Sequence, residues 1–166
     1  NTEFVSSEYA GLFMNGSFGT HSTIADNIPA PIFPLTAIGF QMQYKISEKF
    51  SGKIVVFDGF PDNFENNPNN LSWKLKPDDG LLTISELTYN YHLQNKLPGT
   101  YKIGGYYHNH YKVILSESDS AIILPNNYGF YLVADQPVFK KPDGRQLAIF
   151  TQASISSKQK NENWYY

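Results

Sequence analysis

The sequence predicts an all-β fold, an antiparallel up-and-down meander of about eight strands. Segments rich in β-branched and aromatic residues recur along the chain, and the connections between them are alternately long and short. The short connections force neighbouring strands to be antiparallel, because a parallel crossover needs about a dozen residues or more. Aromatic residues make up 16% of the chain, and no window shows a sustained helical period.

The expected strands follow these segments in order. They span residues 11–18, 35–46, 50–59, 81–93, 100–108, 128–139 and 145–156, and an eighth begins at Trp164. The long connections are residues 20–34, 60–80 and 109–127, and the short ones are 47–49, 94–99 and 140–144. Barrels of outer membranes have long loops outside the cell and tight turns in the periplasm. We expect the same orientation here, with residues 1–166 as a single barrel segment.

Side chains alternate between an apolar and a polar face along the expected strands. In one strand, the apolar face carries Ile38, Phe40, Met42, Tyr44 and Ile46, and the polar face carries Gly39, Gln41, Gln43 and Lys45. A soluble β-sandwich would show the same alternation. Two features favour a membrane barrel. The polar faces carry mostly amides and hydroxyls, and Tyr and Trp residues lie near strand ends, as in an interfacial girdle.

Composition narrows the classes of function. The net charge of -2 and the lack of a basic run give no reason to expect nucleic acid. The chain has no Cys for disulfides or thiol chemistry, and it has no apolar run of about 18 residues that would form a membrane-spanning helix. Because it begins at Asn1 without an apolar leader, we expect a mature product or an excised segment.

Motifs for catalysis and metal binding are weak. The sequence has no GxSxG, P-loop or HExxH motif, and Asp58 with Glu86 is only a remote candidate for a glycosidase pair. His108 and His110 are two residues apart, but two His side chains do not complete a metal site. The Asn-rich stretch at 62–70 lacks the ligand order of a calcium loop. We therefore expect no enzyme, no cofactor and no metal ion.

Several short motifs occur in a fixed order. They are GLFMNGSFG at 11–19, PIFPLTAIG at 31–39, DGLLTISEL at 79–87, PGTYKIGGYYH at 98–108, YGFYLVADQ at 128–136 and LAIFTQ at 147–152. Each motif alone is weak evidence. Their order and spacing together resemble the carbohydrate-selective outer-membrane porins of the OprB-type family.

The resemblance implies a passive carbohydrate channel in the outer membrane of a Gram-negative bacterium, built on a barrel of about 16 strands. The chain would be roughly the middle half of such a porin, in contact with carbohydrate solutes and membrane lipid. A homo-oligomer is compatible with the resemblance, because large porins are often trimers. The alternative is a soluble β-sandwich or small closed barrel that acts as a carbohydrate-binding or structural module; a closed barrel of about eight strands would be filled by side chains.

The polar faces supply the candidate pore-lining residues. These candidates are Gln41, Gln43, Lys45, Glu86, Asn90, Lys102, Gln136 and Gln152. Asp135 and Gln136 are adjacent, so only one of them can face the lumen unless a bulge intervenes. A carboxylate within a strand must face water or a partner, and Lys102 on the next strand is the expected partner of Glu86. Arg145 is the only Arg, so we do not expect this chain to supply an arginine cluster at a constriction.

Overall fold

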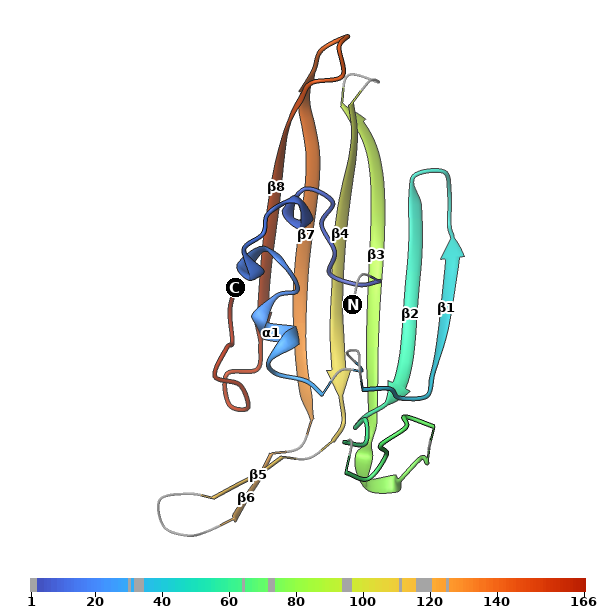
Figure 1. Ribbon diagram of the computed structural model, residues 1–166, viewed down its shortest axis with the longest axis vertical. Helices are drawn as coiled ribbons and strands as arrows, with labels where there is room; N and C mark the ends of the chain where they lie inside the picture. Colours follow the sequence, from blue (N-terminus) through green and yellow to red (C-terminus); the bar gives the residue numbers. More distant parts are fainter. Residues whose placement is uncertain are drawn as a thin grey trace.

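The computed structural model describes residues 3–29, 31, 35–63, 65–71, 74–93, 97–110, 112–115, 121–124 and 126–166. Six strands form one antiparallel sheet in the order β1-β2-β3-β4-β7-β8 (Figure 1). Their bounds are β1 (Gly39–Lys45), β2 (Phe50–Asp58), β3 (Leu81–Leu93), β4 (Leu97–His108), β7 (Asn127–Lys140) and β8 (Gln146–Ser156). Strands β5 (Lys112–Leu115) and β6 (Ala121–Leu124) form a separate hairpin between β4 and β7. The sheet is therefore the predicted meander.

The strand predicted at residues 11–18 is wrong. This stretch contains two 3-10 turns, η1 (Ala10–Leu12) and η2 (Gly16–Phe18), and Gly19 N donates a hydrogen bond to Gly16 O at 3.0 Å. Glycine has a high entropic cost in an extended strand and is suited to turns. The other helical elements are α1 (Ser22–Ala25) and η3 (Pro77–Asp79). No helix in the described ranges is long and apolar enough to cross a membrane.

The strand predicted from Trp164 onward is present only as a short pairing. Tyr165 forms an isolated antiparallel bridge with Ile155 of β8, and the backbone of Tyr166 exchanges two hydrogen bonds with Ser154 at 2.9 and 3.0 Å. β1 and β8 stand at opposite ends of the strand order. The sheet is therefore open, and the alternative of a small closed barrel is wrong.

The cross-strand register assigns every strand residue to one of two faces. One row of partners across β2, β3, β4, β7 and β8 is Lys53, Glu86, Gly104, Tyr131 and Ser154. The adjacent row is Gly52, Leu87, Ile103, Leu132 and Ala153. Because successive side chains in a strand point to opposite sides, the two rows lie on opposite faces. We call the face of the first row the inner face and that of the second row the outer face.

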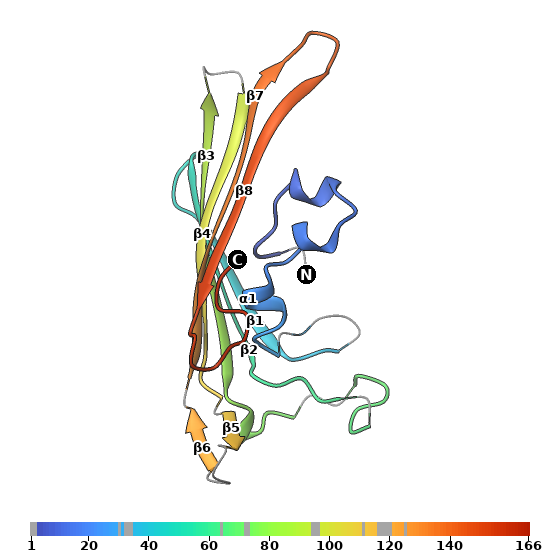
Figure 2. The same ribbon diagram turned by 90° about the vertical axis from the view of Figure 1, so that its left-hand side faces the viewer.

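Residues 3–29, which we call the inner segment, lie against the inner face (Figure 2). The main apolar core lies between the two layers and consists of Phe4, Val5, Ile24, Ile28, Val55, Leu82, Ile84, Tyr106, Tyr131 and Val133. The expectation that all of residues 20–34 form an external loop is thus wrong for residues 20–29. Burial of apolar side chains such as Ile24 and Ile28 explains why this stretch returns to the sheet.

The connections divide between the two ends of the sheet. The tight turns that follow β1 and β7 lie at one end, the turn end. Strands β5 and β6 and the described residues between β2 and β3 (59–63, 65–71 and 74–80) lie at the other, the long-loop end (Figure 1). In the turn after β7, Lys141 N donates to Arg145 O at 2.8 Å, and Gly144 has a φ of 90°. A residue with a side chain is strained at such a φ, so glycine suits this turn.

Candidate functional site

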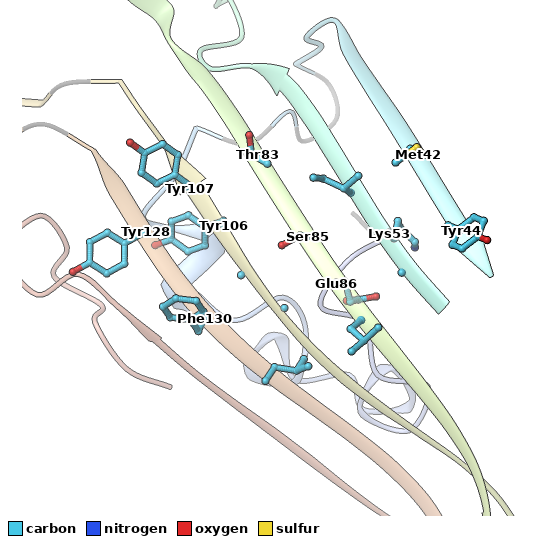
Figure 3. A pocket seen from close by; sticks show the side chains of 16 residues that line it. Met42, Tyr44, Lys53, Thr83, Ser85, Glu86, Tyr106, Tyr107, Tyr128 and Phe130 are labelled. Carbon is cyan, nitrogen blue, oxygen red and sulfur yellow. The ribbon is translucent and has the colours of Figure 1, made fainter. Parts of the chain in front are cut away.

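The outer face is a broad apolar surface that no described segment covers (Figure 2). Its exposed side chains include Phe40, Met42, Tyr44, Ile54, Leu87, Ile103, Phe130, Leu132, Leu147, Ile149 and Ile155. Figure 3 shows Met42, Tyr107 and Phe130 among the side chains around a shallow hollow in this face. Soluble monomers rarely expose an apolar patch of more than a few hundred Å². The outer face therefore requires an apolar environment.

Tyrosines lie toward both ends of the outer face. Tyr107 and Tyr128 are cross-strand partners near the long-loop end. Tyr89 and Tyr101 are cross-strand partners closer to the turn end, with ring centroids 6.2 Å apart. Tyrosine is enriched where a membrane protein meets the lipid headgroups. The outer face thus has the apolar band and the flanking aromatic residues of a lipid-exposed barrel wall.

Gln136 lies on the outer face, opposite to the other predicted pore-lining residues. Its Oε1 accepts a hydrogen bond from Tyr101 Oη at 2.6 Å, and its Nε2 donates to Pro137 O at 2.7 Å and to Leu97 O at 3.3 Å. These partners satisfy an amide on an apolar face. The inner face instead receives the neighbouring side chain, Asp135, whose cross-strand partner in β4 is Thr100.

Lys53 and Glu86 hold the start of the inner segment. Lys53 Nζ on β2 donates to Glu3 O at 2.7 Å and lies 3.2 Å from Glu3 Oε2. Its ammonium is also 5.0 Å from the ring centroid of Phe4. On β3, Glu86 Oε2 accepts hydrogen bonds from Val5 N at 3.1 Å and from Tyr131 Oη at 2.9 Å. The ammonium group of Lys53 thus binds a backbone carbonyl of the inner segment. The carboxylate of Glu86 on the next strand binds a backbone N–H group of the same segment.

The same alternation continues on the next two strands. Lys102 Nζ on β4 donates to Ser6 O at 2.7 Å and to Ser6 Oγ at 3.0 Å. Asp135 on β7 accepts from Ser7 Oγ at 2.5 Å and from Glu8 N at 2.9 Å. Residues 3–8, the crossing stretch, thus pass over β2, β3, β4 and β7 in order. Each strand contributes one charged side chain, and such hydrogen bonds are about twice as strong as neutral ones.

The predicted ion pair between Glu86 and Lys102 is wrong. The register places Glu86 opposite Gly104 and places Lys102 opposite Thr88, two residues farther along the strand. Both charged groups are instead used by the crossing stretch, and Glu86 is only 5% exposed. Glu86 is therefore an anchor for the inner segment rather than a group that faces an aqueous lumen.

The second half of the inner segment docks near β4 and β8 through neutral groups. Thr23 and Ser154 have their hydroxyl oxygens 2.5 Å apart, and Tyr106 Oη donates to Thr23 O at 3.1 Å. His21 is fully buried, with its ring stacked on Tyr166 at a centroid distance of 4.7 Å. Burial lowers the pKa of His21 to about 4. This part of the segment therefore docks with a neutral imidazole.

The other predicted pore-lining residues lie on the inner face. Gln41, Gln43, Lys45 and Asn90 are exposed there, on β1 and β3. Gln152 on β8 is half-buried, and its amide atoms have no hydrogen-bond partner within the described ranges. With Glu86 and Lys102 under the inner segment, four of the eight predicted residues are open to solvent on the inner side. Their role in a pore stays a prediction.

The sequence did not predict that the inner segment packs against the inner face of the sheet. Leu12 at the end of η1 and Met14 between η1 and η2 are both highly exposed. Phe13 is anchored by contacts with Phe18 and Phe150, at centroid distances of 4.9 and 5.5 Å. The useful signal is the run Leu12, Phe13 and Met14, because three successive apolar residues do not suit a strand with one polar face.

The described residues contain no group of three His, Cys, Asp or Glu side chains that could hold a metal ion. His108 and His110 stack with ring centroids 5.6 Å apart, and His110 Nδ1 lies 2.7 Å from Asp78 O. Asp58 and Glu86 are on β2 and β3, where Glu86 is occupied by Val5 and Tyr131. The inner face thus offers hydrogen-bonding groups and charge, arranged around a docked segment.

Comparison with known proteins gives a family and a similar fold. The sequence profile described as "Carbohydrate-selective porin, OprB family" matches residues 1–166. A solved structure described as "High pH structure of Pseudomonas putida OprB" is similar with a TM-score of 0.66 and 20% sequence identity. The match covers 76% of this chain and 32% of that chain, so this chain spans only part of the length of the solved porin. A comparison with curated protein sequences gave no match.

At this level of identity, the solved structure supports the fold, and the profile match over the whole chain establishes the family. The sheet agrees with both, since it is an open antiparallel meander with one apolar and one polar face. The chain belongs to the carbohydrate-selective porins of the OprB family, which are outer-membrane proteins of Gram-negative bacteria.

Proposed function

We propose that this chain forms part of the wall of a water-filled channel through which carbohydrates diffuse passively, without catalysis or a cofactor. The observation that carries the proposal is the difference in polarity between the two faces of the sheet. The outer face is apolar and uncovered, and the inner face carries amides, charges and a docked segment. A transmembrane barrel needs this division between a lipid side and a water side. A soluble module would have to expose the outer face to water.

Further strands must complete the wall. Among the described residues, the outer edge of β1 has no partner strand, and β8 is followed only by a short pairing with Trp164 and Tyr166. Unpaired backbone groups are costly in hydrocarbon, which is why membrane sheets close into barrels. The family resemblance suggests a complete barrel of about 16 strands.

The inner segment narrows the water-filled space in this proposal. It lies on the side of the sheet that a barrel would enclose, and its first residues are fixed by charged groups from four strands. Gln41, Gln43 and Asn90 remain exposed beside it. Amides both donate and accept hydrogen bonds, so they can exchange water for sugar hydroxyls without holding the solute tightly.

Reconstitution of the full-length porin in planar bilayers tests the proposal. Open channels in potassium chloride should lose conductance when glucose or maltotriose is added, because a solute in the narrowed lumen displaces ions. A polyethylene glycol of similar mass controls for simple exclusion of volume. Conductance that no sugar reduces beyond this control would contradict the assignment of a carbohydrate solute.

A further inference from the structure

A second feature of the inner face is a cavity of about 590 Å³ at the long-loop end. It lies where four parts of the chain meet, namely the end of the inner segment, the loop after β2, the neighbouring ends of β4 and β7, and the loop after β8. The residues that matter for the argument are Asp26, Phe60, His108, His110, Asn127 and Asn161. Sites for small ligands have volumes of roughly 300–1,000 Å³. The cavity is thus large enough for a small organic solute.

Part of the cavity lining is a row of rings. The ring centroids of Phe60 and His110 are 5.6 Å apart, as are those of His110 and His108. The contact of His110 Nδ1 with Asp78 O helps to fix the middle ring. Phe60 is 46% exposed, so it presents a ring to solvent. A planar apolar surface of this kind suits the C–H face of a pyranose ring.

Next to this row, the lining includes two side-chain amides that are hydrogen-bonded to each other. Asn127 Nδ2 donates to Asn161 Oδ1 at 3.0 Å, and Asn161 Nδ2 donates to Asn127 Oδ1 at 2.9 Å. Asn127 Nδ2 also donates to Asn27 O at 3.0 Å. Each amide oxygen has two lone pairs and accepts one of these bonds, which leaves capacity for a hydroxyl donor. The amides are therefore preorganised acceptors, and the adjacent Asp26 adds a carboxylate.

Charge in the cavity is balanced. Asp26 supplies one carboxylate and Lys160 supplies one ammonium group. His108 is 3% exposed, and its Nε2 has no hydrogen-bond partner within the described residues. A buried polar atom without a partner is unusual and points to a missing partner. A neutral ligand with many hydroxyls fits this combination better than an anion or a cation does.

We propose that this cavity is a saccharide-binding site at the long-loop mouth of the channel, in which a pyranose ring stacks on Phe60 and its hydroxyls bond to the Asn127–Asn161 pair. The inference rests on the proposed function and extends it by assigning a place where the sugar binds before it passes through the channel. The site lies next to the loops that would face the external medium. It thus raises the local concentration of sugar before the solute reaches the inner segment.

The test compares Phe60→Leu with Phe139→Leu in the full-length porin. Phe139 is a matched control, because its ring is 53% exposed but lies on the outer face. The measurement is the concentration of glucose or maltotriose that halves the sugar-sensitive current, with each variant normalised to its own conductance in potassium chloride. Phe60→Leu should raise this concentration about fivefold, as expected for loss of one stacking contact. Phe139→Leu should leave it within twofold of the wild type.

The outcomes separate the two proposals. If the wild type is blocked by sugar and Phe60→Leu stays within twofold of it, the cavity is not the saccharide site, while the channel function stands. An equal loss in Phe139→Leu would also overturn the site, since it would show a general effect on the barrel. If no sugar affects the wild type beyond the polyethylene glycol control, the channel function fails and the saccharide site fails with it.

Discussion

The outer and inner faces of the sheet are built by the same strands, yet they are stabilised differently. The outer face needs an apolar environment to be stable, because none of the described residues covers its large apolar side chains. The inner face is covered by part of the chain itself, through an apolar core and a set of charged hydrogen bonds. The polar residues at alternate strand positions therefore include side chains that bind the inner segment as well as side chains that are exposed to solvent. In this protein several of them hold a second layer against the inner face.

The largest expected effect comes from a charge in the middle of the outer face. Ile103→Lys would place an ammonium group in hydrocarbon and should cost roughly 2–4 kcal/mol. Urea unfolding of the full-length porin in lipid vesicles measures the loss. Gln41→Lys on the inner face is the control and should change the free energy of unfolding by less than about 0.5 kcal/mol. Equal losses for the two variants would contradict the assignment of the faces.

The next effect concerns the anchor of the crossing stretch. Glu86→Ala leaves Val5 N and Tyr131 Oη without their acceptor, and an unsatisfied buried donor costs about 1–3 kcal/mol. Backbone hydrogen exchange at residues 3–8 should therefore become faster. Asn90→Ala, on the same strand but exposed, should leave these rates unchanged. If exchange in Glu86→Ala equals that of the wild type, this carboxylate does not hold the segment.

A smaller effect is expected from pH. Burial lowers the pKa of His21 from 6.5 to about 4. The imidazole of His21 is therefore protonated less readily when the inner segment is docked than when the segment is released from the sheet. Docking is therefore strongest above about pH 6.5 and weakens as the pH falls toward 4, by about 1 kcal/mol at pH 5.5. Hydrogen exchange at residues 22–25, corrected for intrinsic rates, reports the change. His21→Phe keeps a ring against Tyr166 and should remove the pH dependence; an unchanged profile would exclude His21 as its origin.

The smallest effect tests the position of Gln136 on the outer face. Gln136→Leu removes an amide from the outer face and should leave the sugar-sensitive current within twofold of the wild type. The free energy of unfolding should change by about 1 kcal/mol or less, since Tyr101 Oη loses one acceptor. Asn90→Leu on the inner face is the comparison and should weaken the sugar block more. A larger loss of block in Gln136→Leu would return this residue to the lumen.

Much of the sheet could be predicted because its strands have a clear period of two. The strand predicted at residues 81–93 coincides with β3, where inner residues such as Glu86 alternate with outer residues such as Leu87. The stretch at 11–18 forms turns instead of the predicted strand, because its aromatic residues favour strands while its glycines allow turns. Local composition alone did not resolve this conflict.

The site was harder to predict because it depends on register. Whether Asp135 or Gln136 faces inward follows from the pairing of β7 with β4, which no sequence pattern sets uniquely. Lys102 is adjacent to Glu86 in strand order but is offset by two residues. Its actual partner, Ser6, is 96 residues away along the chain. Contacts at such separations are specified by tertiary structure rather than by local spacing.

The alternating charges of Lys53, Glu86, Lys102 and Asp135 also have a consequence for the order of assembly. The four groups come from four adjacent strands, and they match the crossing stretch only when these strands are paired in register. A displacement of one strand by one residue would turn its charged side chain to the outer face, and a displacement by two residues would move it about 7 Å along the strand, away from its partner. We therefore expect the crossing stretch to dock after its strands have paired, because the loop-closure entropy of such long-range contacts must be paid before the contacts stabilise the chain. In the proposed channel, we expect the sheet to form first and the inner segment to narrow the lumen only once the strands beneath it are in register.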